Sequence, residues 1–183
     1  MKAVTLLKVC AALTLSGALG GCASLSKNEC LAANWEDIGV RDGANGAGEE
    51  QLIRHSTACA KVGVTPDREA WLRGRERGLE RFCVPQRAYQ RGESGYDFDV
   101  GICRVFDVDR LAQAYERGRD VHRLAGVIDS IDGEIAEVRA LLERTDLENK
   151  ERERLAYRLG QLEYEREDAL RSYEDARYRG RHL

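Results

Sequence analysis

The C-terminal part of the chain has a regular spacing of apolar side chains. Successive members are three and four residues apart in alternation: Val121, Leu124, Ile128, Ile131, Ile135, Val138 and Leu142. Such a heptad pattern predicts a long helix with one apolar seam. A second heptad pattern, interrupted at Arg166, follows: Leu155, Leu159, Leu162, Ala169, Tyr173 and Ala176.

The segment Thr145-Asp146-Leu147-Glu148 lies between the two heptad patterns and has the form of a capping box, so we expect the second helix to begin there. A break between two long helices predicts an antiparallel hairpin over residues 107–183. Each arm would reach roughly 50 Å at 1.5 Å per residue. Because the first seam is more apolar than the second, we expect self-association or a partner's helix to complete it.

Residues 30–106 have a different pattern, with short apolar runs, four cysteines, both tryptophans and most of the glycines. We expect a helix over about 49–62, and a second over about 65–83 with Thr65 as its N-cap and Pro66 at its first position. Residues 84–103 are rich in glycine and aromatic residues and predict a loop, and a helical turn is expected around Trp35. The predicted fold class is mainly α: a small disulfide-stapled, loop-rich helical domain at 30–106, then the helical hairpin.

The start of the chain has the pattern of a secretory signal. Lys2 and Lys8 supply positive charge, and the apolar run at residues 9–19 is too short to cross a bilayer as a helix. The run ends in Leu19-Gly20-Gly21-Cys22, which resembles the lipobox of bacterial lipoprotein precursors. The alternative is an ordinary secretory signal followed by a chance cysteine.

The lipobox resemblance implies removal of the signal peptide at residues 1–21 and lipidation of Cys22 with fatty acyl chains such as palmitate. Two or three acyl chains anchor a protein stably to a membrane. Ala23 stands where lipoproteins retained in the inner membrane of enteric bacteria typically carry Asp. We therefore expect a Gram-negative protein anchored in the outer membrane through acylated Cys22 and facing the periplasm, with residues 22–29 as a tether.

The charge balance argues against a nucleic-acid partner. The whole chain has a formal net charge of −3, and residues 1–21 contain two lysines and no acidic residue. Their removal makes the remaining chain still more acidic, whereas nucleic-acid-binding domains are basic.

Four cysteines remain for disulfides in an oxidising compartment: Cys30, Cys59, Cys83 and Cys103. No two of them have the C-x2-C spacing of a zinc site, so we expect no metal and no other cofactor. Three pairings are possible. The pairing Cys30–Cys59 with Cys83–Cys103 is favoured because each bond closes a local loop, worth about 3 kcal/mol in the chain-entropy model.

One short pattern, aromatic-x-Arg-Gly-charged, occurs three times, at intervals that fit no regular repeat. Because positions i and i+3 share a helix face, each ring would lie beside its glycine. This arrangement favours close helix packing. The alternative is an aromatic and arginine-lined groove that recognises a glycan or peptide, formed by Trp71, Arg73, Tyr89, Arg91, Tyr115 and Arg117.

The glycine and cysteine pattern of residues 30–120 resembles a family of small Gram-negative envelope lipoproteins that is catalogued only as a domain of unknown function. The resemblance rests on Trp35-x3-Gly39-x2-Asp42-Gly43-x2-Gly46, Cys59-x3-Gly63-x2-Pro66-Asp67, Gly74-Arg75-x2-Gly78-Leu79-x3-Cys83, and Tyr89-x2-Gly92-x2-Gly95 with Cys103. Trp71 departs from the family pattern, where tyrosine is expected. The resemblance implies an envelope location and assigns no activity, substrate or catalytic residue.

No motif in the chain is typical of an active site. The glycines at 43, 46 and 48 lack the preceding strand and following Lys-Ser/Thr of a phosphate loop. Asp97-x-Asp99-x-Gly101 lacks the glutamate at position 12 of a calcium loop, where Val108 stands. The remaining candidates are a carboxylate pair for glycoside cleavage and a His-x3-Cys pair, drawn from Glu36, Asp37, Asp42, His55 and Cys59.

Three classes of function remain open. The first, which the sequence favours, is a non-enzymatic structural or partner-binding lipoprotein that uses residues 107–183 to bind an envelope protein or a second copy. The second is a glycan- or peptidoglycan-binding module built on the aromatic-x-Arg-Gly elements. The third is a cell-wall hydrolase.

Overall fold

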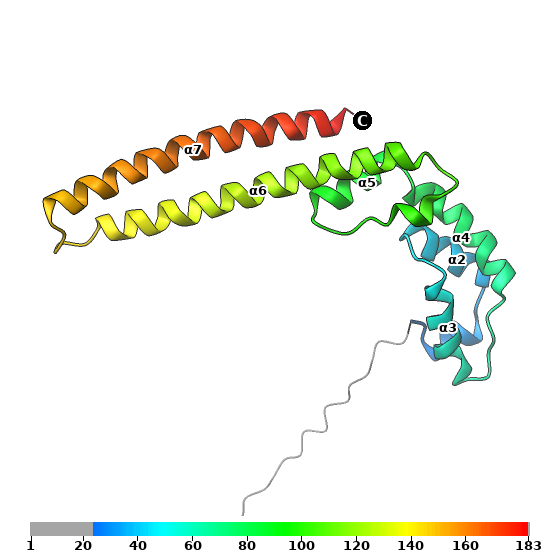
Figure 1. Cartoon of the computed structure of the whole chain (residues 1–183). Helices are drawn as coiled ribbons and strands as arrows, with labels where there is room; N and C mark the ends of the chain where they lie inside the picture. The colour runs from blue at the N-terminus through cyan, green and yellow to red at the C-terminus, as the bar shows by residue number, and fades with distance from the viewer. Residues whose placement is uncertain (1–23, 183) are drawn as a thin grey trace, which may run out of the picture.

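The computed structural model describes residues 24–182, and this part of the chain contains helices and no strand. A body of short helices is joined to a long hairpin that projects from it at an angle (Figure 1). The order is α1 Lys27–Leu31, α2 Trp35–Ala44, α3 Glu50–Ala60, α4 Arg68–Phe82, α5 Pro85–Glu93, the 3-10 helix η1 Val100–Cys103, α6 Val108–Leu142 and α7 Asn149–Arg181. The predicted fold class, a stapled helical domain followed by a long antiparallel hairpin, is confirmed.

Nothing in this part of the chain forms a helix that is both long and apolar enough to cross a membrane. The expected signal peptide at residues 1–21 and the lipidated Cys22 lie outside the described residues.

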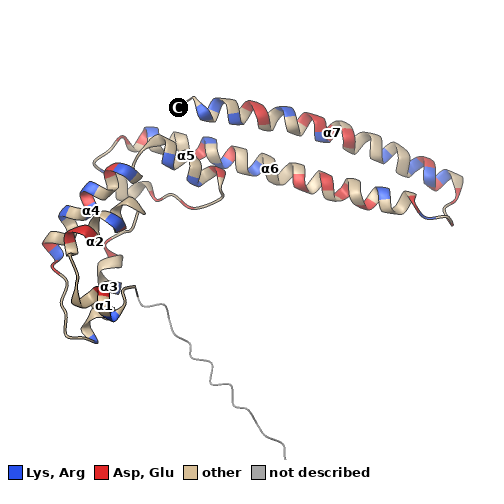
Figure 2. Ribbon diagram, turned by 180° about the vertical axis from the view of Figure 1, so that it is seen from behind, with Lys and Arg blue, Asp and Glu red and all other residues tan. Residues whose placement is uncertain are grey.

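The hairpin closes on itself along the predicted seams. Ile128, Ile131 and Ile135 of α6 pack against Leu162 and Ala169 of α7, and each is at most 9% exposed. The seam of α6 therefore packs against α7 within one chain, and its completion by a partner or a second copy stays a prediction. Acidic and basic residues are interspersed along both helices (Figure 2).

Ion pairs across the hairpin explain the interruption of the second heptad. Arg166 stands at a seam position, and its Nε donates to Asp132 Oδ1 at 2.5 Å. Two further pairs join the helices, Arg139 with Glu163 and Arg158 with Glu134, both at 2.9 Å. All six side chains are at least 39% exposed, so each pair contributes little to the stability of the fold.

The predicted capping box in the hairpin turn is wrong. Helix α7 begins at Asn149, and Glu148 caps it without a side-chain hydrogen bond. Asp146 instead accepts from Arg144 at 2.8 Å, which lowers the pKa of the Asp146 carboxyl. Arg152 donates to the carbonyls of Leu142 and Arg144, at 2.7 and 2.8 Å. The turn is therefore held by an arginine that satisfies carbonyls at the end of α6.

The segment after residue 23 is folded onto the body and is not the tether that we expected. Leu25 is 4% exposed and packs in a core cluster with Trp35, Cys59 and Trp71. Ser26 caps α1 in a capping box with Glu29: the Ser26 N–H donates to Glu29 Oε2 at 2.8 Å. That hydrogen bond from the backbone lowers the pKa of Glu29.

The two helices expected in the stapled region are present with shifted bounds, because Asp67 and not Thr65 caps α4 through a 2.9 Å bond from the Ala70 N–H. The loop expected at 84–103 is wrong over its first half, which is helix α5. Pro85 ends α4 as expected, but it also occupies the first turn of α5, where its missing N–H costs nothing. Where we expected a helical turn around Trp35, the structure has the ten-residue helix α2.

Helices α2 and α4 cross in direct backbone contact, which four glycines permit. A Cβ on Gly39 or Gly43 would collide with the backbone of Trp71 or Arg75. A Cβ on Gly74 would overlap the Glu36 carbonyl, and one on Gly78 the carbonyl of Val40. Any side chain at these positions would push the helices apart.

Helices α5 and α6 cross in the same way. A Cβ on Gly92 would collide with the Tyr115 carbonyl, and one on Gly118 with the Tyr89 carbonyl. The three aromatic-x-Arg-Gly elements thus all lie at helix crossings, one in the first pair and two in the second.

The two crossings belong to two equivalent units. In the first, Cys30 precedes Gly39 by nine residues and Cys59 precedes Trp71 by twelve; in the second, Cys83 precedes Gly92 by nine and Cys103 precedes Tyr115 by twelve. An arginine four residues after each ring lies over it, Arg75 on Trp71 and Arg119 on Tyr115, both 5.9 Å from the ring centroid. The stapled region is therefore built from a duplicated pair of helices.

The hydrophobic core of the second unit extends past residue 106, where we predicted that the stapled domain ends and the hairpin begins. Leu111, Ala114 and Val121 of α6 pack with Phe82 of α4 and with Ala176 of α7 in one cluster. The single helix α6 thus belongs to the stapled body at its start and to the hairpin at its end, which joins the two parts rigidly.

Candidate functional site

The most buried polar cluster of the described chain is centred on Asp42. This carboxylate of α2 is 8% exposed, and its Oδ2 accepts hydrogen bonds from His55 Nε2 at 2.9 Å and from Trp71 Nε1 at 2.8 Å. His55 comes from α3 and Trp71 from α4, and they are 1% and 0% exposed. One carboxylate therefore joins three helices in the hydrophobic core of the first unit.

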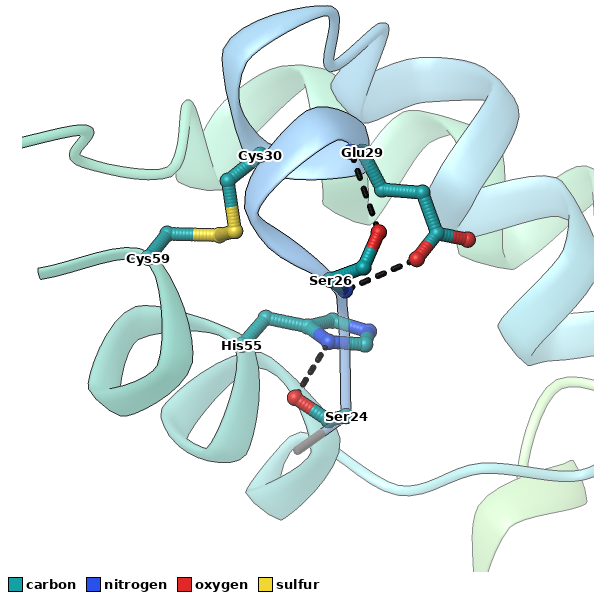
Figure 3. The surroundings of a disulfide bond; sticks show 6 residues. All are labelled: Ser24, Ser26, Glu29, Cys30, His55 and Cys59. Carbon is teal, nitrogen blue, oxygen red and sulfur yellow. Dashed lines mark hydrogen bonds between the residues drawn. A yellow bond between two sulfur atoms is a disulfide. The ribbon is translucent and has the colours of Figure 1, made fainter. Parts of the chain in front are cut away.

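The other nitrogen of the His55 imidazole, Nδ1, contacts the first described residue, Ser24. Ser24 Oγ lies 2.9 Å from His55 Nδ1, beside the Cys30–Cys59 disulfide that links α1 to α3 (Figure 3). In a neutral imidazole whose Nε2–H donates to Asp42, Nδ1 accepts a hydrogen bond from the Ser24 hydroxyl. The network places Ser24, two residues after Cys22, directly on the body.

Ser24, His55 and Asp42 are hydrogen-bonded in sequence and are the residue types of a hydrolytic triad. Its imidazole is enclosed, because both ring nitrogens are engaged and the side chain is 1% exposed. Every fully buried side-chain nitrogen and oxygen in residues 24–182 has a partner. The described geometry is that of a satisfied network that holds the segment before α1 together with α2, α3 and α4.

The four cysteines form the two disulfides favoured by loop size, Cys30–Cys59 and Cys83–Cys103. Cys59 therefore has no thiol for the His-x3-Cys chemistry considered above. Among residues 24–182, no group of three His, Cys, Asp or Glu side chains could hold a metal ion.

The other carboxylates named from the sequence bind neighbours. Asp37 Oδ2 accepts from the amide of Asn34 at 2.7 Å, and Glu36 pairs with Arg77 and, at 3.8 Å, with Arg73. Asp99 caps η1 by accepting from the Gly101 N–H at 2.7 Å. Each of these contacts stabilises a helix end or a helix pair.

The six residues of the predicted recognition groove do not gather on one surface. Trp71 and Tyr89 are buried, with 0% and 2% of their surface exposed, and Tyr115 is half-buried. Their arginines point elsewhere: Arg73 pairs with Glu36, and Arg91 donates to the Asp97 carbonyl at 2.8 Å. Arg117 lines a small hollow between α5 and α6. Recognition of a glycan by these residues stays a prediction. In the structure, the buried rings of Trp71 and Tyr89 pack in the helical body.

One of these rings does face a hollow, which we call the α5–α6 cleft. It has a volume of about 430 Å³ and is lined by Gly92, Gly95, Asp97, Tyr115, Glu116, Arg119, Asp120, His122 and Arg123. Gly95 has φ = +73°, and a Cβ there would stand 2.6 Å from His122 Cε1. The cleft is mostly polar and contains charged groups of both signs.

The pKa of the Tyr89 hydroxyl is raised by its surroundings. Burial, and then the neighbouring Glu93 that accepts its hydroxyl at 3.1 Å, raise the pKa of Tyr89 to about 12. The ring also packs against Gly180, where a Cβ would strike it. Tyr89 therefore ties the end of α7 to α5.

Because the folded pKa of Tyr89 is above its ordinary value of 10, the native state retains a proton that the unfolded state loses. This stability is complete below pH 10 and is lost as the pH rises towards 12. Between pH 9 and 12 the wild type should lose about 2 kcal/mol more than Tyr89→Phe in urea unfolding followed by circular dichroism. The exposed Tyr164→Phe is the control, and equal losses in wild type and Tyr89→Phe would contradict the prediction.

Sequence reasoning missed three features of this region. Asp42, His55 and Trp71 were separate candidates, and no spacing indicated that they meet. Ser24 was assigned to a tether. The equivalence of the two units was visible in the paired spacings Cys-x8-Gly and Cys-x11-aromatic-x2-Gly, but the unequal gap between them conceals the repeat.

The fold and site together define an all-helical, disulfide-stapled domain with an appended hairpin. Residues 34–120 match the model of a family described as a protein of unknown function (DUF2799), so this part of the chain is similar to that family. The match covers both helix crossings and ends where α6 leaves the body for the hairpin. No curated protein and no solved structure matches the chain.

Proposed function

We propose that the protein is a lipid-anchored envelope lipoprotein that holds a rigid helical arm away from the outer membrane to bind a protein partner in the periplasm, without catalysis. The observation that supports this most is the continuity of α6. Leu111 and Val121 are in the core of the stapled body, and Ile131 is in the hairpin seam of the same uninterrupted helix. The arm therefore keeps a fixed direction relative to the body.

Acylation at Cys22 would hold one end of this structure at the membrane. Ser24 is fixed on His55 and Leu25 is buried, so almost no free chain remains between the acyl chains and the body. The hairpin turn lies at the opposite end of the molecule from α1 and α3 (Figure 1). An arm of 35 residues reaches about 50 Å from the start of α6.

The outer face of α7 offers a surface for the partner. Tyr157, Tyr164 and Tyr178 are 72%, 69% and 61% exposed, and their intervals of seven and fourteen residues place them on one face. Exposed tyrosine supplies large contact area with a polar end and is enriched in protein interfaces. Of the charged side chains between the rings, Arg171 pairs within α7, with Asp168 at 3.2 Å, whereas Glu163 and Arg166 pair with α6.

Photo-crosslinking in cells of the full-length protein tests the proposal. A benzophenone side chain at Tyr164 should give a discrete crosslinked product, while the same group at exposed Glu137 on α6 should give none. Tyr157→Ser with Tyr178→Ser should remove the product at unchanged abundance. A product of twice the chain mass would identify a second copy as the partner; no product at Tyr164, or equal products at both sites, would contradict partner binding by α7.

The alternative function is a glycan- or peptidoglycan-binding module, which the open α5–α6 cleft favours. It places the aromatic ring of Tyr115 and the guanidinium of Arg119 at the surface of the family domain. Co-sedimentation with isolated sacculi separates this function from partner binding, because the tyrosine variants of α7 should leave it unchanged.

A further inference from the structure

The α5–α6 cleft occupies positions that are filled in the first unit. Counting from the shared cysteines and glycines, its lining residues Gly92, Gly95, Tyr115 and Arg119 are equivalent in sequence to Gly39, Asp42, Trp71 and Arg75. The same crossing is therefore closed in one unit and open in the other.

In the first unit a carboxylate fills the crossing. Asp42 binds the aromatic N–H of Trp71 and the imidazole of His55, which α3 brings over the crossing as a cover. The result is complete enclosure, with Trp71 0% exposed. A carboxylate, an aromatic hydrogen-bond donor and an imidazole thus make one satisfied set.

In the second unit the carboxylate and its cover are both missing. Gly95 stands at the position of Asp42 and has no side chain. The chain between Gly92 and Cys103 is nine residues shorter than that between Gly39 and Cys59, and it contains only η1 where the first unit has α3. The aromatic ring and an imidazole remain, from Tyr115 and His122, around a hollow of about 430 Å³.

The charges around this hollow are mixed. Arg119 and Arg123 face it, and each is paired loosely along α6, with Glu116 at 3.6 Å and Asp120 at 3.4 Å. All four side chains are at least 60% exposed, so these pairs contribute little stability and can be rearranged by a ligand. Asp97 adds a third carboxylate on the opposite wall. Such a lining can serve a ligand that carries both a negative and a positive charge.

We propose that the α5–α6 cleft binds a small zwitterion of the amino-acid type, either free or as the end of a peptide. Its carboxylate takes the place that Asp42 fills in the first unit, between Tyr115, Arg119 and His122. Its ammonium group pairs with the acidic side chains of the rim, Glu116, Asp120 or Asp97. This site is independent of the tyrosine face of α7.

The test is a titration of the ¹⁵N-labelled chain from residue 22, with Cys22→Ser, using the dipeptide Ala-Ala as the probe. Backbone amides of Gly92, Gly95 and residues 119–123 should shift in a saturable way, while amides of residues 36–44 in the first unit should not. Ala-Ala amide and N-acetyl-Ala-Ala should each bind about tenfold more weakly, because each lacks one charged group. Alanine itself and a longer alanine peptide distinguish a free amino acid from a peptide end.

Arg119→Ala should weaken binding of Ala-Ala about tenfold, whereas Arg117→Ala, on the same helix but outside the cleft, should not change it. The absence of saturable shifts with Ala-Ala would overturn the proposal. Equal binding of the blocked dipeptides, or equal effects of Arg117→Ala and Arg119→Ala, would overturn it as well.

Discussion

Gly74→Ala is expected to destabilise the protein by about 3 kcal/mol or more, a large effect for adding one methyl group. A Cβ at this position would overlap the Glu36 carbonyl group and approach Val40 N to 3.0 Å. Both neighbours are helix backbone and cannot rotate away as a side chain can. Helices α2 and α4 would have to separate, which opens the core around Trp71 and weakens the hydrogen bonds of Asp42.

The chain offers a matched control for this substitution. Gly126 also lies within a helix, but nothing stands within 4 Å of a Cβ built there. Gly126→Ala should therefore stabilise the protein by about 0.4–1 kcal/mol, because alanine loses less conformational entropy in a helix. Urea unfolding of the oxidised proteins measures both. A Gly74→Ala variant as stable as the wild type would show that the helices are not in the close contact described.

The sequence was most informative where one local pattern decides the outcome. The heptad spacing from Val121 to Leu142 predicted a long helix with a buried seam, because an apolar stripe of that period can be buried only along one helix face. The disulfide pairing followed from loop size. The helix and the disulfide pairing could both be predicted because the spacing of the residues along the sequence identifies which segments meet.

Prediction failed where long-range packing overrides local preference. The sequence Pro85–Glu93 has a proline and a glycine and predicts a loop, yet Gly92 is required by the crossing of α5 with α6. The tether failed for a similar reason, since the burial of Leu25 depends on a core formed by residues far along the chain. Self-association was predicted from the larger apolar content of the α6 seam, and it stays a prediction. Within one chain, Arg166 at the facing seam position pairs with Asp132.

The candidate site was only partly predictable. Its residues were named individually, as Asp42 and His55 among possible catalytic groups and Trp71 among possible recognition groups. Their meeting depends on the crossing angle of α2 with α4 and on the disulfide that holds α3 nearby, neither of which is encoded in a short motif. The duplication of the helix pair is the feature that sequence spacing alone could have revealed.

Asp42→Ala is expected to destabilise the protein by about 3 kcal/mol, because it removes the carboxylate that two buried hydrogen-bond groups share. Trp71 Nε1–H and His55 Nε2 both lose their contact with the carboxylate, and each unsatisfied buried group costs about 1–3 kcal/mol. The loss should extend to the start of the chain, since Ser24 is held by the other nitrogen of the same imidazole. The indole N–H of Trp71 should then exchange with solvent faster than in the wild type, which NMR measures directly.

Two variants give this prediction its controls. Asp37→Ala removes an exposed carboxylate of the same helix that bonds only to Asn34, and it should cost less than about 1 kcal/mol. Asp42→Asn keeps an acceptor oxygen and should fall between the two. The indole N–H of Trp35, which is not part of the network, is the internal reference for exchange. Equal stabilities of Asp42→Ala and Asp37→Ala, with unchanged exchange at Trp71, would show that the network does not hold the first core together, and Asp42 and His55 would become candidates for chemistry at this end of the molecule.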